Sequence, residues 1–430
     1  MTDRIVDKAY RVIKNHSLCD NCLGRLFGFT GYNLRNEERG RSIKTVLLMD
    51  AYSTADGIKD KDITIALAET GFEPAITILA KYDVEITIKE CEICKGLLKE
   101  LNEIVDRIID KTKDYEFRTF QVGCRVPSDM VAREEKIWTL YDLRNAESFK
   151  SEFTREVGKR FSEKTGKEYS LHLPDLVIIV DLVKDAIEIS SKSLYIYGRY
   201  CKFARGLPQN PWLYEHDERI KYNTSIEEII TAPLIEMAQA KGAKFHAAGR
   251  EDIDVRMLGN GRPFVVEVKD PKIRSIDLTR AEEEINRNSQ GLISVHGLRF
   301  VDKSFVSKIK ALSEISSKVY VAVARFSKPV RNEELSKLEE FFKEIVIIQR
   351  TPKRVLHRRT DRVRRKVVYE VKARKLDGNK VEFRIKCQGG LYVKELIHGD
   401  GGRTKPNFAE FLNNEVLDIT LDVVEIQEVV

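Results

Sequence analysis

The sequence predicts an α+β protein of two domains, and three observations lead to this prediction. The chain has 430 residues, which exceeds the roughly 250–300 residues that one hydrophobic core usually organises. Its first half carries two cysteine pairs among amphipathic helices, whereas helices and strands alternate through its second half. We therefore expect a mixed α/β accessory domain over residues 1–205 and a second domain over residues 206–430, in which helices pack on a mixed, largely antiparallel sheet.

The elements of the first domain follow from the spacing of their apolar residues. Helical spacing covers the first 15 residues, 36–52, 95–113 and most of 132–161, and strand-like stretches cover 117–126, 176–183 and 186–197. Residues 194–202 interleave tyrosines with basic residues, which is typical of a half-buried strand and also of an RNA-facing ribbon. Pro208 and Pro211 indicate a linker, so we place the domain boundary near residues 205–215.

The second domain shows a regular alternation of helix and strand patterns without internal repeats. Helices are expected over 226–241, 279–288, 303–313 and 332–342, and strands over 264–268, 293–301, 318–325, 344–349, 366–374, 381–388 and 417–427. This order predicts the mixed sheet with helices packed against it.

Composition excludes a membrane protein and indicates a cytoplasmic one. Apolar residues make up 42% of the chain, yet no run approaches the roughly 18 apolar residues that span a bilayer. The first residues lack the pattern of a secretory signal. Charged residues reach 33% but nearly cancel, leaving a net charge of +6. A nucleic-acid partner must therefore be sought in the distribution of charge rather than in its sum.

One segment concentrates positive charge. Residues 353–366 hold eight lysines or arginines and a single acid, Asp361, so that their net charge of +7 exceeds that of the whole chain. A solvated basic loop is one interpretation; phosphate binding is favoured because arginines predominate, and their planar fork suits phosphate. The candidate RNA-binding residues are Arg354, His357, Arg358, Arg359 and Arg362.

Four of the seven cysteines form two Cys-x2-Cys pairs, Cys19 with Cys22 and Cys91 with Cys94. An odd count without a secretory signal argues against a disulfide framework. Four thiolates are the tetrahedral set that zinc prefers in structural sites, although chance or redox use of the pairs stays open. We expect one structural zinc per chain. A zinc deaminase is excluded because its downstream Pro-Cys-x-x-Cys is missing.

The charged stretch at residues 249–263 carries the main chemical signal of the chain. Two aspartates and three arginines lie there between glycines, after an amphipathic helix and before an apolar strand. Guanidinium groups beside a carboxylate keep the acid ionised and fix its direction. Such an aspartate is a metal ligand, a member of a structural ion pair or a nucleophile.

The order of residues in this stretch favours the nucleophile among these three roles. Gly249-Arg250-Glu251-Asp252 resembles the Gly-Arg-x-Asp of tRNA pseudouridine synthases, and its continuation through Arg262-Pro263 resembles the Pus-ten family among them. A second match runs from Gly390-Leu391-Tyr392-Val393-Lys394 to Gly402-Arg403-Thr404-Lys405-Pro406-Asn407. The two cysteine pairs fit the same family. The resemblance implies an N-terminal zinc-binding and THUMP-like RNA-binding domain, followed by a pseudouridine synthase domain.

The resemblance also implies roles for individual residues. Asp252 would be the nucleophile, Tyr320 would stack on the target uracil, and Tyr392 and Val393 would line its pocket. Arg250 would hold the space or phosphate that the flipped base vacates, and Lys394 would pair with Asp252. Without the resemblance, Tyr320 reads as an ordinary strand tyrosine.

Two further assignments concern acids near the candidate nucleophile and in the basic run. We expect Asp254 to be a structural partner of Arg256. Arg359-Thr360-Asp361 also resembles the Arg-x-Asp of the synthases, but Asp361 lies among eight cations, which favours a counter-ion within the basic run.

The function that the resemblance implies is the isomerisation of uridine to pseudouridine at positions 54 and 55 in the T-arm of tRNA. The reaction needs no organic cofactor, and the sequence shows no obligatory protein partner. The competing hypothesis is a tRNA-binding or chaperone-like protein of the same fold without catalytic activity.

Overall fold

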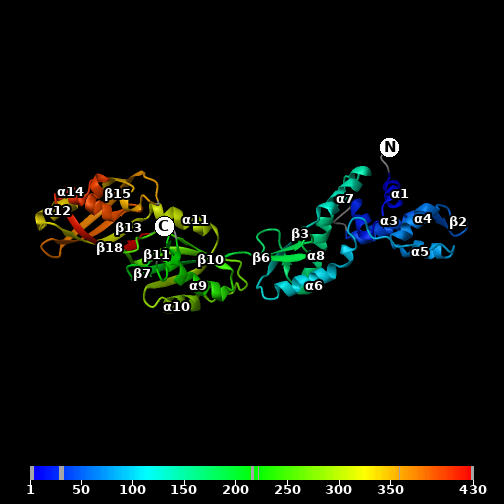
Figure 1. The fold of residues 1–430 in the computed structure, drawn as a ribbon, viewed down its shortest axis with the longest axis horizontal. Helices are drawn as coiled ribbons and strands as arrows, with labels where there is room; N and C mark the ends of the chain where they lie inside the picture. The colour runs from blue at the N-terminus through cyan, green and yellow to red at the C-terminus, as the bar shows by residue number, and fades with distance from the viewer. Residues whose placement is uncertain (1–3, 29–32, 215–216, 221, 358, 428–430) are drawn as a thin grey trace. The chain divides into compact units, whose positions relative to one another are not determined.

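The computed structural model describes residues 4–28, 33–214, 217–220, 222–357 and 359–427 of the chain. The chain folds into two compact units, Met1–Lys192 and Ser193–Val430, drawn from blue to red in Figure 1. Among the described residues, no helix combines the length and apolar character needed to cross a bilayer.

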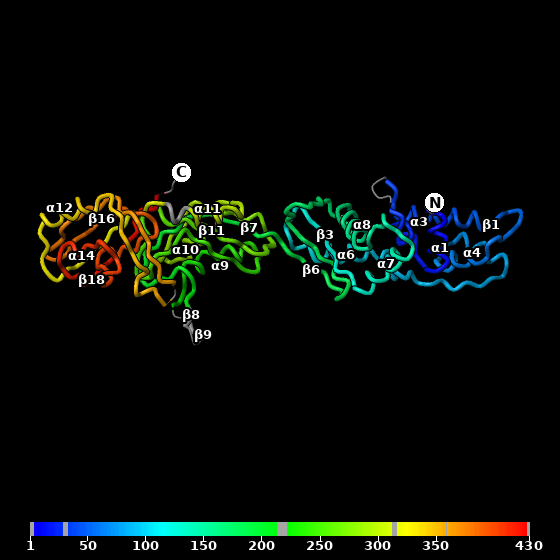
Figure 2. The backbone as a smooth tube through the Cα atoms, turned by 90° about the horizontal axis from the view of Figure 1, so that it is seen from above, coloured from blue at the N-terminus to red at the C-terminus, as the bar shows by residue number. Residues whose placement is uncertain are grey.

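The first unit begins with a helical bundle and ends with a small mixed sheet (Figures 1 and 2). Its helices are α1 (Ile5–Asn15), α2 (Asp20–Leu26), α3 (Asn36–Ala51), α4 (Lys61–Glu69), α5 (Glu73–Ala80), the 3₁₀ helix η1 (Leu97–Lys99), α6 (Leu101–Thr112), α7 (Ser128–Leu140) and α8 (Phe149–Thr165). Its strands are β1 (Tyr52–Ser53), β2 (Gly57–Ile58), β3 (Thr119–Arg125), β4 (Glu168–Tyr169), β5 (Leu176–Asp181) and β6 (Ala186–Ser191).

Local sequence explains the boundaries of α8, the longest helix of the first unit. Ser148 caps its start by accepting a hydrogen bond from the backbone N–H of Ser151, and Gly166 ends it in the left-handed region at φ +68°. Phe153, Val157 and Phe161 recur at helical spacing and are fully buried. They pack towards the four-stranded sheet β4-β3-β5-β6, in which only the β5–β6 pair is antiparallel.

The second unit is built on a ten-stranded sheet. Its path runs β12-β7-β11-β18-β13-β16-β15-β14-β17, and β10 pairs with β11 beside this path. The β11–β18 pair is parallel and every other pair is antiparallel, so the predicted mixed, largely antiparallel sheet is confirmed. The strands are β7 (Leu194–Lys202), β10 (Gly242–Ala247), β11 (Arg256–Lys269), β12 (Ile293–Val301), β13 (Ser317–Phe326), β14 (Ile345–Arg350), β15 (Val363–Lys375), β16 (Lys380–Gln388), β17 (Thr404–Lys405) and β18 (Val416–Ile426).

Helices cover both faces of this sheet around β7 and β11 (Figure 1). Phe264 and Val266 share the large core with Ile230 and Ile285, whereas Val265 on the opposite face packs near Ile309. The helices of the unit are α9 (Ile226–Ala238), α10 (Leu278–Asn288), α11 (Ser304–Ile315), α12 (Asn332–Phe341), η2 (Lys353–Val355), α13 (Val393–His398), η3 (Gly399–Gly402) and α14 (Phe408–Phe411). A two-stranded hairpin, β8 (Leu213–Tyr214) with β9 (Asp217–Ile220), precedes α9.

The boundary between the two units lies between Lys192 and Ser193 in the sequence. It comes earlier than the boundary near residues 205–215 that the sequence predicts. The reason is β7, which pairs along its length with β11 and β12 of the second unit. The continuous strand expected over 186–197 is instead two strands, β6 and β7, that belong to different sheets. The tyrosines of 194–202 therefore lie within the large sheet, where Tyr197 and Tyr200 are buried.

Candidate active site and cysteine cluster

Residues 248–255, here called the 248–255 loop, connect β10 to β11 and carry the candidate nucleophile Asp252. Gly249 adopts φ +85°, and a Cβ there would lie 3.1 Å from Nη1 of Arg262 and 3.4 Å from Nζ of Lys318. The backbone conformation favours glycine at this position, and a Cβ there would in addition be tight against Arg262. The loop is therefore pressed closely against two cations of the sheet.

A buried cluster of Glu251, Arg262 and Tyr200 holds the 248–255 loop in place. Nε of Arg262 donates to Glu251 Oε2 at 2.7 Å, and the hydroxyl of Tyr200 donates to the same carboxylate at 2.9 Å. Nη1 of Arg262 also donates to the carbonyl of Ala248, and Gln209 donates to the carbonyl of Gly249. Burial and then the charge of Glu251 raise the pKa of Tyr200 well above its ordinary value, so its phenol stays protonated and donates.

Asp252 forms an ion pair with Arg354. Nη1 of Arg354 lies 2.8 Å from Oδ2 of Asp252, and the side chain of Asp252 remains 27% exposed. Nε of the same arginine donates at 2.6 Å to Glu395, a carboxylate on α13 whose side chain is only 1% exposed. Arg354 thus connects the 248–255 loop to α13 and holds an accessible, aimed carboxylate.

Lys394 pairs with Asp254 and not with Asp252. Its Nζ lies 2.6 Å from Oδ2 of Asp254, so the expected Lys394–Asp252 contact is wrong. Burial opposes ionisation of Asp254, but the hydrogen bond from Lys394 prevails and lowers the pKa of this carboxyl. The expected Asp254–Arg256 pair is also wrong, because Arg256 pairs at 2.5 Å with Asp422, the residue opposite it on β18.

Of the two candidate tyrosines, Tyr320 lies on the strand that the sequence predicts, whereas Tyr392 lies at the start of a helix that the sequence did not predict. Tyr320 lies in the middle of β13, and burial and the neighbouring Cys387 raise the pKa of its phenol. Tyr392 directly precedes α13, where Gln349 bonds both its backbone N–H and its carbonyl. The guanidinium carbons of Arg354 and Arg364 each lie 5.9 Å from the centre of the Tyr392 ring. Val393, next to it, is buried.

Arg250 lies on the loop beside Asp252, with its guanidinium 6.0 Å from the centre of the Trp212 ring. The ring of Trp212 in turn lies 6.0 Å from that of Tyr222. The sequence assigns a role to neither aromatic residue; Trp212 directly follows the Pro208–Pro211 linker and lies within the stretch near 205–215 where the sequence predicts the domain boundary.

The basic run occupies η2 and the start of β15 together with the segment between them. His357, Arg359 and Arg362 are exposed, and Arg358 lies outside the described residues. Asp361 pairs with Arg403 at 2.6 Å and with Arg350 at 3.1 Å. These two partners lie outside residues 353–366, so Asp361 links the run to the rest of the unit instead of neutralising the run internally.

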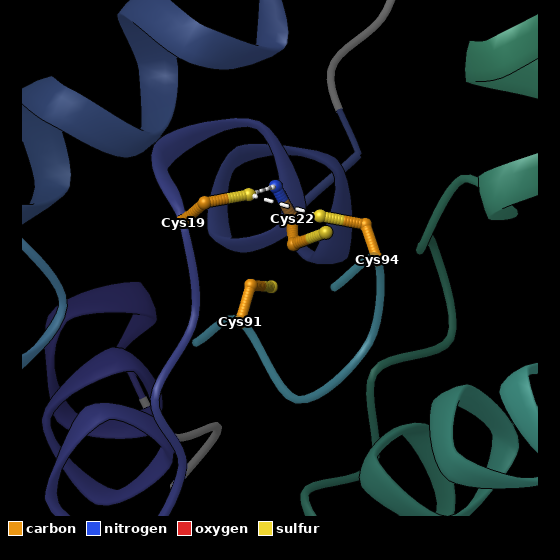
Figure 3. A group of neighbouring side chains, drawn as sticks. All are labelled: Cys19, Cys22, Cys91 and Cys94. Carbon is orange, nitrogen blue, oxygen red and sulfur yellow. Dashed lines mark hydrogen bonds between the residues drawn. The ribbon is translucent and has the colours of Figure 1, made fainter. Parts of the chain in front are cut away.

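The four paired cysteines converge in the first unit (Figure 3). Their sulfur atoms all lie within 4.8 Å of one another, and Sγ of Cys19 lies 3.6 Å from Sγ of Cys94. Zinc bound tetrahedrally at a Zn–S distance of about 2.3 Å separates its sulfurs by about 3.8 Å, so the cluster fits such an ion. Arg25 donates to Sγ of Cys22 at 3.6 Å. Burial raises the pKa of the Cys22 thiol, and the charge of Arg25 opposes this shift. The cluster can hold a metal ion with no open position for a reactant.

Comparisons with known proteins decide the family. The family model described as "Pus10, C-terminal" matches residues 195–427, and "Pus10 THUMP domain, archaeal" matches residues 104–181. A relative from Thermofilum pendens, named tRNA pseudouridine synthase Pus10, is 52% identical over 98% of this chain and 96% of its own length. The chain belongs to the Pus10 family.

The Pus10 match extends over both units. A relative of the same name from Methanopyrus kandleri is 40% identical over 98% of each chain. The family assignment makes the protein a pseudouridine synthase and places a THUMP domain in the first unit. A crystal structure described as a Cbf5-Nop10-Gar1 complex aligns over 53% of this chain and 48% of that one at 18% identity, but its TM-score of 0.30 is too low to support an argument.

The Pus10 site includes several residues for which the sequence predicts no role there. Glu251 belongs to the 248–255 loop itself, whereas the others contact this loop or its partner Arg354: Arg262, Tyr200, Lys202 and Glu395. Glu251 and Arg262 lie within the charged stretch at residues 249–263, so an ion pair between them could have been predicted from the sequence. Tyr200 and Lys202 gave no such signal, because they come from a strand that the sequence assigned to the other domain.

Proposed function

We propose that this Pus10 protein isomerises uridine to pseudouridine at positions 54 and 55 in the T-arm of tRNA, with Asp252 as the nucleophile. The observation that carries the proposal is the Asp252 carboxylate. It is accessible, is paired at 2.8 Å with Arg354 and lies on a loop fixed by the buried Glu251 cluster. A surface ion pair without catalytic use does not need a fully buried second pair beneath it.

The reaction breaks the N1–C1′ glycosidic bond, turns the uracil and joins C5 to C1′. Asp252 attacks C6 of the ring or C1′ of the sugar and is released when the new bond has formed. C5 loses its proton and N1 gains one, so that no atom is supplied by a cofactor. Arg354, 2.8 Å from the carboxylate, holds Asp252 in one direction throughout. The target uridine has to leave its stack, which requires a pocket for the flipped base.

The neighbouring side chains fit such a pocket. Tyr320 stacks on the uracil, and its raised pKa keeps the phenol protonated. Tyr392 and Val393 form an apolar wall that excludes water and strengthens the electrostatic contacts inside. Lys394 acts on Asp252 through Asp254, since it fixes the far end of the same loop. Arg250 occupies the gap that the flipped base leaves.

The exposed basic run contacts the tRNA backbone through His357, Arg358, Arg359 and Arg362. Arg354 belongs to the run by sequence, but its guanidinium is committed to Asp252 and Glu395. The bound metal of the cysteine cluster is zinc, held by Cys19, Cys22, Cys91 and Cys94 in a structural role. The THUMP-bearing first unit adds tRNA contacts, and the protein works in the cytoplasm.

The test is incubation with unmodified tRNA followed by mapping of pseudouridine at each position. Asp252→Asn keeps the shape of the side chain but removes its charge, so single-turnover product should vanish while tRNA affinity changes little. Asp361→Asn is the matched control and should alter affinity more than the chemical step. A wild-type protein that binds tRNA but yields no pseudouridine would favour the alternative, a tRNA-binding or chaperone-like protein. Activity in Asp252→Asn, with loss in Asp361→Asn, would overturn the nucleophile assignment.

A further inference from the structure

The last residue of β7 is a buried lysine, Lys202, that bonds the backbone of the candidate nucleophile Asp252. Lys202 is only 1% exposed. Its Nζ donates to the backbone carbonyl of Ile253 at 2.7 Å and to that of Asp252 at 3.3 Å. Within the described part of the chain, the ammonium group of Lys202 forms no ion pair. The hydrogen bonds of its Nζ go to backbone carbonyls. Burial lowers its pKa to about 8, against the attraction of Glu251, Asp254 and Asp252.

Packing alone does not explain a lysine at this position. An apolar side chain would fill the same space without the cost of burying an ammonium group. The two carbonyls also do not require the lysine to be satisfied. The carbonyl of Asp252 accepts from Val255 N–H at 3.0 Å, and that of Ile253 accepts from Gly206 N–H at 2.9 Å. What Lys202 adds is a second donor to each of two consecutive peptide groups.

These two peptide groups set the direction of the carboxylate. The carbonyl of Asp252 lies on the peptide between residues 252 and 253, and the carbonyl of Ile253 lies on the next peptide, so holding both restricts the backbone rotation at Ile253 and fixes the peptide that follows Asp252. Glu251 is held on the other side of Asp252 by Arg262 and Tyr200, so the peptide that Lys202 fixes limits where the Cα–Cβ bond of Asp252 points. Arg205, three residues after Lys202, donates at 2.7 Å to the carbonyl of Asp254, so the same segment holds three successive carbonyls of the loop.

We propose that Lys202 is a positioning residue for the isomerisation. Through the carbonyls of Asp252 and Ile253 it fixes the backbone that aims the Asp252 carboxylate at the uridine. The inference rests on the proposed function of Asp252. It predicts that loss of Lys202 slows the chemical step while the binding of tRNA, which depends on other surfaces, is retained.

The experiment compares Lys202→Met and Lys202→Arg in the full-length protein with unmodified tRNA. Single-turnover rates at saturating enzyme, tRNA dissociation constants and melting temperatures are measured. Misplacement of a reacting group by about 1 Å costs on the order of 100-fold in rate, so Lys202→Met should lose about 10- to 100-fold in rate and less than about 3-fold in affinity. Lys202→Arg retains charge and donors and should recover a part of the rate that Lys202→Met loses.

Two controls separate positioning from stability and from the nucleophile assignment. Val381→Ala removes buried core atoms from β16 and should lower the melting temperature without slowing the reaction. Asp252→Asn should be inactive; if it is active, the proposed function fails independently of Lys202. With Asp252→Asn inactive, a wild-type rate in Lys202→Met overturns the positioning role, as does a loss of rate that Val381→Ala reproduces at equal stability. If Lys202→Met does not fold, Lys202→Gln takes its place against Lys202→Arg under the same criteria.

Discussion

Replacement of Arg354 by methionine should reveal two separable functions of this guanidinium. Arg354 touches the accessible carboxylate of Asp252 at 2.8 Å and the buried carboxylate of Glu395 at 2.6 Å. Breaking a buried ion pair costs about 3–5 kcal/mol. Because the side chain of Arg354 is 36% exposed, solvent screening reduces this figure, and we expect Arg354→Met to lower the free energy of unfolding by about 1–3 kcal/mol.

The effect on catalysis should be separable from the effect on stability. Without Arg354, Asp252 loses its direction, and a single-turnover rate about 100-fold below wild type is expected. Glu395→Gln in the Arg354→Met background removes the unpaired buried charge. The double variant should therefore regain most of the stability lost in Arg354→Met but none of the rate. Arg354→Lys should have a stability and a rate between those of the wild type and Arg354→Met, because one ammonium group cannot bond two carboxylates as the planar guanidinium does.

Urea unfolding and single-turnover assays on the same preparations measure both quantities. A wild-type rate in Arg354→Met would rule out this role of Arg354 in catalysis, as would a double variant that regains rate along with stability. A normal rate combined with weaker tRNA binding and a shallower salt dependence would instead make Arg354 a phosphate contact, as its place in the basic run suggests.

Three further predictions concern other parts of the protein. Cys91→Ser should release the bound metal and lower the melting temperature of the first unit; metal analysis showing no zinc in fresh wild-type protein would contradict the assignment. Arg359→Ala with Arg362→Ala should weaken binding to all tRNAs and reduce the slope of log affinity against log salt by about 2, whereas an unchanged slope would leave the run a solvated surface. Lys318, 6% exposed, has its pKa lowered to about 7 by burial and then by the charge of Arg262. The folded state then binds fewer protons than the unfolded state between pH 7 and about 10, so the free energy of unfolding should rise with pH in this window. Lys318→Met should be more stable than the wild type at pH 7 and should lose this rise. Denaturant titrations at several pH values measure both effects.

The sequence predicted the elements of the second unit well because their periodicity is local. The strands over 293–301, 318–325, 344–349 and 381–388 correspond to β12, β13, β14 and β16 within two residues. It failed where pairing partners are distant. Nothing local distinguishes β6 from β7, yet the partners of β7 are β11 and β12, and this choice moves the domain boundary.

The candidate site shows the same limit. The motif around Asp252 identified the loop, and four cysteines identified the cluster that Figure 3 shows. The partner of Asp252 was missed, because Arg354 lies about a hundred residues further along the chain and the sequence offered Lys394 from a motif instead. Spacing can place a carboxylate on a loop, but which of several cations reaches it depends on the tertiary path.

The parallel pairing of β11 with β18 makes the loop that carries Asp252 dependent on a strand that lies 166 residues further along the chain. Arg256, the first residue of β11, is held by Asp422, and Asn260 exchanges two hydrogen bonds with Ile426. The base of the loop that carries Asp252 therefore lacks these supports until β18 has paired with β11. Contacts across such sequence separations form slowly. During refolding, the modifying activity should therefore return later than the secondary structure of the second unit.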